Sequence, residues 1–196
     1  MAAELVVAEG TRRSNMSRLR SWLGTSASGE AYLPEAYSGR IILNPLVDSD
    51  WRHIKVLSGP GLSALQVSTL IAILELVRGA PLADAAPGQW HWAEELRTDM
   101  ASLLRDTGAV LARRARALDD VDVARWATNR ALAAAPEDEL LLVEKLRTEQ
   151  LAGNRREVER LVQRITQQAR SLGIDLAPAT VRACQEAMEG RIRARA

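Results

Sequence analysis

Beyond residue 90 the chain consists of apolar stripes at helical spacing, separated by short turns that contain glycine or proline. The clearest stripe lies in residues 155–172, where apolar side chains recur every three or four positions and Gly173 follows. Such spacing places the apolar residues on one side of an α-helix, and a glycine after the last turn is typical of a helix end. Each helix–turn–helix unit spans about 32 to 38 residues, a period that predicts stacked helical hairpins of the tetratricopeptide kind.

The rest of this region has the same pattern. Phe is absent and aromatic residues make up 4% of the chain, so the core must be mainly aliphatic. Small residues mark the expected helix crossings, at Ala124, Ala127, Ala131 and Gly153. A helix that closes at Pro136 is expected to begin near Asp119, Asp120 and Asp122, where negative charge meets the positive helix end. The other predicted helices cover residues 48–56, 62–77, 90–118, 139–151, 155–172 and 178–192.

The N-terminal part has a different organisation. Residues 11–23 form an amphipathic pattern with Met16, Leu19 and Leu23 on one side, and Gly24 is suited to end the helix. Residues 31–33 and 40–43 have the pattern of two short strands joined by a turn. We therefore predict a mostly α-helical chain with a small partial winged helix, a helix plus a β-hairpin, in residues 1–47. The helical domain then covers residues 48–196.

The composition of the chain argues against several classes of protein and of binding site. The 196 residues are 47% hydrophobic and 26% charged, as in a globular domain. A single cysteine, Cys184, and two histidines leave no material for a disulfide framework or for a zinc site, so we expect neither a metal nor a cofactor. No apolar run approaches the roughly 18 residues that a membrane span needs, and no secretory signal is recognisable, which predicts a cytoplasmic protein without membrane contact.

No catalytic constellation is found. The chain has no glycine-rich phosphate loop, no Gly-x-Ser-x-Gly elbow and no His-Glu-x-x-His motif. We interpret Cys184 as a small apolar side chain, His53 and His91 as structural imidazoles, and the three aspartates before the fifth predicted helix as capping residues rather than a cation site. Tryptophans at 90, 92 and 126 are expected to be packing anchors. These observations do not favour an enzyme.

Arginine is unusually frequent and locally clustered. The net charge is only +1, yet 24 of the 26 basic residues are arginine, a bias that a genome rich in G and C also produces. The densest cluster lies in residues 11–21. On the predicted helix its polar side opposes the apolar side and consists of Arg13, Ser14, Ser17, Arg18, Arg20 and Ser21. Arginine donates to guanine edges in the major groove, and arginine, serine and threonine donate to phosphates. The candidate DNA-binding residues are Arg12, Arg13, Ser14, Ser17, Arg18 and Arg20, with Arg40 on the wing. The alternative is a solvated amphipathic helix whose arginines have no partner.

The sequence also resembles a known family. Residues 15–24, NMSRLRSWLG, resemble the recognition helix of actinobacterial antibiotic-regulatory-type activators, and residues 39–43, GRIIL, resemble the second wing strand. Residues 48–193 resemble the bacterial transcriptional activator domain, notably in residues 72–82, in the Trp92-Ala93-Glu94 start and from Ala152 to Pro178. Proteins that couple this domain to a peptidoglycan-binding-type motif are the most similar in pattern.

This resemblance implies a tetratricopeptide-like interaction domain behind a winged-helix reader of DNA. Winged-helix domains of the family have a small sheet and two helices before the recognition helix, and only about ten residues precede Thr11 here. The expected function is therefore a transcriptional regulator, or its C-terminal portion, that binds double-stranded DNA and a protein partner such as itself or the transcription machinery. The alternative function is a protein-interaction scaffold that does not bind DNA.

Overall fold

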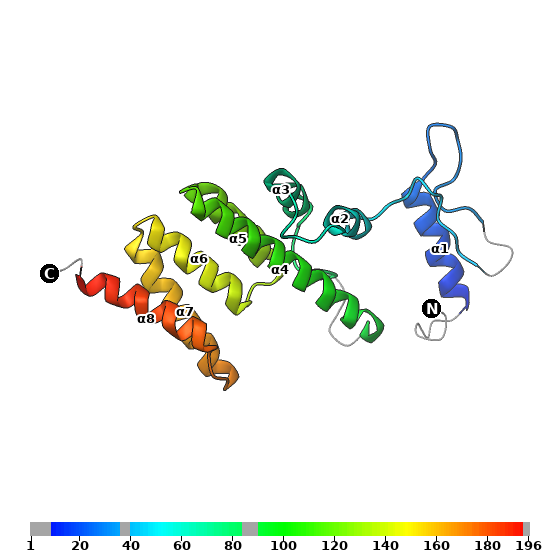
Figure 1. Ribbon diagram of the computed structural model, residues 1–196. Helices are drawn as coiled ribbons and strands as arrows, with labels where there is room; N and C mark the ends of the chain where they lie inside the picture. Colours follow the sequence, from blue (N-terminus) through cyan, green and yellow to red (C-terminus); the bar gives the residue numbers. More distant parts are fainter. Residues whose placement is uncertain (1–8, 36–39, 84–89, 194–196) are drawn as a thin grey trace. The chain divides into compact units, whose positions relative to one another are not determined.

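A computed structural model describes residues 9–35, 40–83 and 90–193, and these residues form eight α-helices (Figure 1). The chain divides into two units, residues 1–53 and 54–196. The helices are α1 (Glu9–Leu23), α2 (Asp50–Ser58), α3 (Val67–Glu75), α4 (Glu94–Ala117), α5 (Val121–Ala134), α6 (Glu139–Leu151), α7 (Arg155–Leu172) and α8 (Pro178–Arg193), and a 3₁₀ turn η1 (His91–Ala93) precedes α4.

The second unit is a set of packed antiparallel helices. Links of three to five residues join α4 to α5, α5 to α6, α6 to α7 and α7 to α8, and such short links force sequential helices to run antiparallel (Figure 1). Helix α4 packs on α3, α5 and α6, while α6 also packs on α7 and α8. The core is aliphatic, as expected from the composition. Its fully buried side chains include Leu70, Ile73, Leu74, Leu111, Leu141, Leu142, Leu146, Leu161 and Ile165.

Helices α4 and α5 approach each other closely through small residues. Ala124, Ala127 and Ala131 of α5 are fully buried, and a Cβ added to Gly108 of α4 would lie 2.3 Å from the Cβ of Ala131. The three alanines therefore lie at a helix crossing, as predicted. The prediction for Gly153 was wrong. This glycine has a φ of +67° in the exposed turn before α7, with no atom near its missing side chain.

Helix α3 is shorter than the predicted helix at 62–77. Residues 61–66 form turns instead, in which the Ala64 N–H donates to Gly61 O and the Leu65 N–H to Leu62 O. The carbonyls of Ser63 and Leu65 accept hydrogen bonds from the Arg114 guanidinium of α4. Because a side chain satisfies these carbonyls, the backbone does not need to continue as a helix there.

The ends of the later helices follow the sequence signals closely. Helices α6 and α7 occupy the predicted ranges, residues 139–151 and 155–172. Gly173 ends α7 with a φ of +64°, the left-handed conformation that glycine adopts without a steric penalty. Side chains cap three starts: Asp120 Oδ1 accepts from the Val123 N–H at 3.0 Å, Asp138 Oδ1 from Leu141 at 3.0 Å and Asn154 Oδ1 from Glu157 at 3.4 Å.

The hydrogen bond from the Val123 N–H to Asp120 allows the predicted capping role of the aspartates before α5 to be tested. We expect Asp120→Ala to lower the free energy of unfolding by about 1 kcal/mol, because the Val123 N–H loses its acceptor. Asp122→Ala is the matched control, since the Asp122 side chain is 97% exposed and it should change stability by less than about 0.5 kcal/mol. Urea unfolding followed by circular dichroism measures both. Equal losses for the two variants would contradict the capping role.

In the first unit, the predicted β-hairpin of residues 31–33 and 40–43 is not formed. The described residues of this unit contain no β-strand, and residues 40–43 form no bridge with another described segment. Residues 24–26 take the place of the expected partner of residues 31–33, because the Ser26 N–H donates to Glu30 O and the Tyr32 N–H to Gly24 O. An isolated antiparallel bridge joins Thr25 to Ala31. The predicted turn residues 36–39 lie outside the described residues.

None of the helices in the described ranges is long and apolar enough to cross a bilayer.

Candidate nucleic-acid interface

Helix α1 forms where the sequence predicts, and it begins two residues earlier, at Glu9. Gly24 ends it with a φ of +73°, and the Gly24 N–H donates to Arg20 O at 2.9 Å. Glu9 lies in the first turn, where a carboxylate interacts favourably with the helix dipole. It also accepts a hydrogen bond from Arg13 at 2.7 Å and lies 3.8 Å from Arg12.

Helix α1 presents hydrogen-bond donors to solvent over about 240° of its circumference, at about 100° per residue. Arg12, Arg13 and Arg18 are exposed, and so are Ser14 and Ser17 between them. We call these five residues the α1 donor face. Glu9 is the only carboxylate in the helix, so α1 carries four arginines and one glutamate, a net charge of +3. This arrangement is suited to phosphate oxygens, which accept hydrogen bonds from guanidinium and hydroxyl groups.

Arg20 lies apart from this face. It is half-buried together with Met16 and Leu23, and its Nε is out of contact with solvent and has no hydrogen-bond partner in the described residues. Leu19, expected to face inward, is 41% exposed instead. The helix is therefore rotated about its axis relative to the predicted wheel, and its inward stripe is 16, 20 and 23. The structure does not bring Arg20 together with the α1 donor face.

Arg40 also differs from its expected setting. Its side chain is exposed, but its backbone belongs to no strand, so the wing on which it was placed is not formed by the described residues. In the segment after it, the Asn44 N–H donates a backbone hydrogen bond to Tyr32 O at 2.8 Å. Arg40 is available to solvent without being positioned by a hairpin.

The support beneath α1 is small. No residue of α1 is buried, and Leu33 is the one buried apolar side chain in the described residues of the first unit before α2. Trp22 is 79% exposed and Ile42 is 67% exposed. Sequence patterning predicted a packed apolar side for α1. The exposure of Trp22 and Ile42 indicates that α1 has few packing partners.

The remaining candidate residues form no chemical site. Within the described residues there is no group of three or more histidine, cysteine or carboxylate side chains placed to hold a metal ion. Cys184 is half-buried, and burial raises the pKa of its thiol, which keeps it protonated. Trp90 and Trp92 stack on each other with ring centroids 5.6 Å apart.

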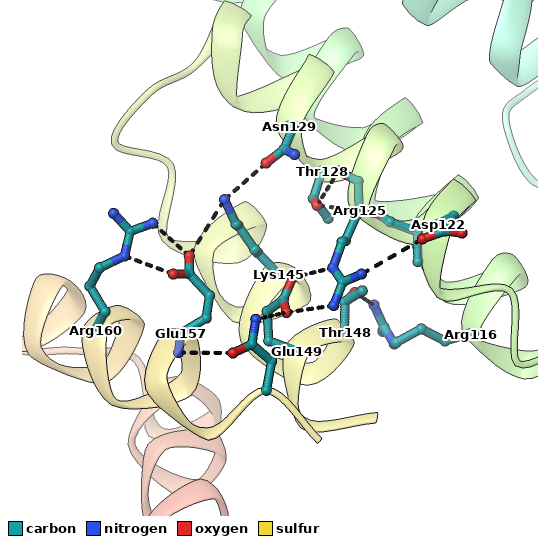
Figure 2. Close-up of polar contacts among 12 residues, drawn as sticks. Arg116, Asp122, Arg125, Thr128, Asn129, Lys145, Thr148, Glu149, Glu157 and Arg160 are labelled. Carbon is teal, nitrogen blue, oxygen red and sulfur yellow. Dashed lines mark hydrogen bonds and ion pairs between the residues drawn. The ribbon is translucent and has the colours of Figure 1, made fainter. Parts of the chain in front are cut away.

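A polar network fixes the packing of α5, α6 and α7 (Figure 2). Arg125 of α5 donates two hydrogen bonds to the Glu149 carboxylate of α6, at 2.7 and 2.9 Å, and Asn154 donates a third at 3.0 Å. Lys145 of α6 bonds Asn129 at 2.9 Å and lies 3.8 Å from Glu157 of α7. Sequence reasoning missed this network, because arginines and glutamates spread over three helices carry no local signal of their pairing.

The Glu149 carboxylate makes stability depend on pH. Hydrogen bonds from Arg125 hold the pKa of Glu149 below its ordinary value, although burial acts in the opposite direction. Because the folded pKa is lower than the unfolded one, the stabilisation is complete above about pH 5.5. It begins to decrease near the ordinary glutamate pKa of about 4.3, and it is lost as the pH falls through the lower pKa of Glu149 in the folded protein. We expect the stability gap between wild type and Glu149→Gln, measured by urea unfolding, to be larger at pH 7 than at pH 4. Exposed Glu186→Gln should show the same gap at both values. A pH-independent gap for Glu149→Gln would contradict this assignment.

The chain has no significant match among protein-family models, curated proteins or solved structures.

Proposed function

We propose that this chain is a transcriptional regulator, or the C-terminal portion of one, that contacts double-stranded DNA through the α1 donor face. The observation that carries the proposal is the exposure of Arg12, Arg13 and Arg18 on one helix whose net charge is +3 in a chain of net charge +1. A helix of this kind fits the major groove, and its guanidinium groups can donate to guanine edges and to phosphates. We assign the chain no catalytic activity.

In this proposal the second unit is a tetratricopeptide-like array that binds a protein partner, either another copy of the chain or the transcription machinery. Its support is the run of antiparallel helices α4 to α8 with links of three to five residues. Helical-hairpin arrays commonly present their outer surfaces to other proteins. The resemblance to actinobacterial antibiotic-regulatory-type activators adds the expectation that such an array stands behind a DNA reader.

A second function is supported by a different observation. The described residues lack the wing hairpin, and no residue of α1 is buried, so the helix is held less firmly than a DNA reader usually is. The chain would then act as a protein-interaction scaffold, and the first unit would not bind DNA.

Fluorescence anisotropy with mixed-sequence duplex DNA separates the two functions. If about four phosphates are neutralised, log K should fall with log salt at a slope of about −3.6. Arg18→Ala should weaken binding and make the slope shallower by about 1. Arg182→Ala is the matched control, because it removes the same charge from an exposed position on α8. Undetectable binding at low salt, or equal effects of the two variants, would favour the scaffold.

A further inference from the structure

Helix α7 has a second arginine-rich surface, to which the proposed function assigns no role. On a wheel at about 100° per residue, six long polar side chains fall within about 120° of its circumference. All six are exposed to solvent. We call them the α7 arginine face: Arg156, Arg160, Gln163, Arg164, Gln167 and Arg170. From Arg156 to Arg170 this face is about 21 Å long, at a rise of about 1.5 Å per residue.

The positive charge on this face is only partly compensated. No carboxylate falls within the 120° sector, but Glu157 and Glu159 each lie about 20° beyond one of its two edges. Glu157 bonds only Arg160 of the face, at 2.6 and 2.8 Å. Arg156 and Arg170 have no ion-pair partner in the part of the chain that the structure describes. Helix α7 carries five arginines and two glutamates, a net charge of +3. Together α1 and α7 carry +6, which leaves −5 for the rest of the chain.

The face is held in place by the rest of the unit. The opposite side of α7 buries Val158, Leu161, Ile165 and Ala169, so the helix cannot turn about its axis. Arg164 donates to Pro136 O at 2.7 Å, which ties the centre of the face to the α5–α6 link. At the N-terminal end, Glu157 lies between Arg160 and Lys145 (Figure 2). A ligand of this face therefore meets two guanidinium groups, those of Arg160 and Arg164, that hydrogen bonds already hold in place.

The composition of the face indicates the class of partner. Protein–protein interfaces have an apolar centre with aromatic anchors, whereas protein–nucleic acid interfaces are more polar and strongly positive. No apolar side chain falls within the sector that carries the α7 arginine face. Arginine donates in pairs to phosphate oxygens, and glutamine amides donate to phosphates as well. We propose that the α7 arginine face binds the phosphate backbone of double-stranded nucleic acid, as a site distinct from the α1 donor face.

Salt-dependent anisotropy with a mixed-sequence duplex tests the site. The informative variant is Arg156→Gln/Arg170→Gln, because neither residue takes part in an ion pair of the described structure and the fold should be unaffected. We expect about a tenfold loss of affinity and a slope of log K against log salt that is shallower by about 2. The control, Arg52→Gln/Arg182→Gln, removes the same charge from exposed positions on α2 and α8 and should change the slope by less than half as much.

A second variant, Arg12→Gln/Arg13→Gln/Arg18→Gln, separates this site from the proposed role of α1. If the α7 variant matches its control while the α1 variant loses binding, the α7 site is overturned and the proposed function stands. If only the α7 variant loses binding, the α7 site stands and the DNA-binding role of α1 falls. Polyglutamate serves as a competitor of matched charge. Displacement of duplex by an equal charge of polyglutamate would overturn the assignment to nucleic acid and favour an acidic protein segment.

Discussion

Glu144→Gln is expected to lower the free energy of unfolding by about 3 kcal/mol. Glu144 of α6 is fully buried, and its carboxylate accepts hydrogen bonds from Arg113 Nε at 2.7 Å and from Arg116 Nη2, both on α4. Arg147 lies 3.8 Å away. Removing the negative charge leaves Arg116, whose side chain is 14% exposed, charged and without its carboxylate partner. Breaking a buried pair in this way costs more than the pair contributes when both members are present.

Urea unfolding at pH 7 measures the loss, and Glu186→Gln is the matched control because this glutamate is exposed on α8. The control should stay within about 0.5 kcal/mol of wild type. The double variant Glu144→Leu/Arg116→Met removes both buried charges and should lose less than the sum of the single variants. A loss below about 1 kcal/mol for Glu144→Gln would show that water reaches Arg116 and that the pair does not hold α4 on α6.

The sequence predicts an element of this fold correctly where the residues that determine the element are its neighbours in the chain. Helices α6 and α7 were predicted to the residue, because Pro136, Gly153 and Gly173 mark their ends within one turn. The predicted hairpin was wrong for the opposite reason. The pairing partner of residues 31–33 depends on which segment lies beside them, and residues 24–26 take that place. Likewise, the shortening of α3 depends on Arg114, a residue that lies about 50 positions further along the chain.

In the candidate interface, too, some features were predicted from local signals and others depend on distant residues. The helical wheel correctly predicted that Arg13 and Arg18 are exposed, since it placed both on the polar side of α1. Arg12 is exposed as well, although on the wheel it lies within about 40° of Met16, Leu19 and Leu23. The wheel failed for Arg20, because the exact inward direction of a helix is decided by what packs against it. The burial of Glu144 was equally unpredictable, since a glutamate on an amphipathic helix is ordinarily placed in solvent. Its burial requires two arginines from another helix.

Gly108→Ala should be destabilising even though alanine is the better helix former. In an exposed helix this change stabilises by about 1 kcal/mol. At position 108 the new Cβ would lie 2.3 Å from the Cβ of Ala131 and 3.2 Å from the Ala127 carbonyl oxygen, so α4 and α5 must separate. Overpacking of this kind typically costs 1–3 kcal/mol, and because a neighbouring backbone must move we expect a net loss of about 2 kcal/mol in urea unfolding.

A second substitution, on α5, can remove this steric clash. It tests whether the clash is the cause of the lost stability. Adding Ala131→Gly to Gly108→Ala removes the atom at 2.3 Å, so the double variant should be more stable than the sum of the two single changes predicts. Gly10→Ala is the control, because no atom lies within 4 Å of its missing side chain in α1 and no loss is expected. If Gly108→Ala were neutral or stabilising, α4 and α5 could separate at little cost. The close crossing would then not be what determines the packing of this pair.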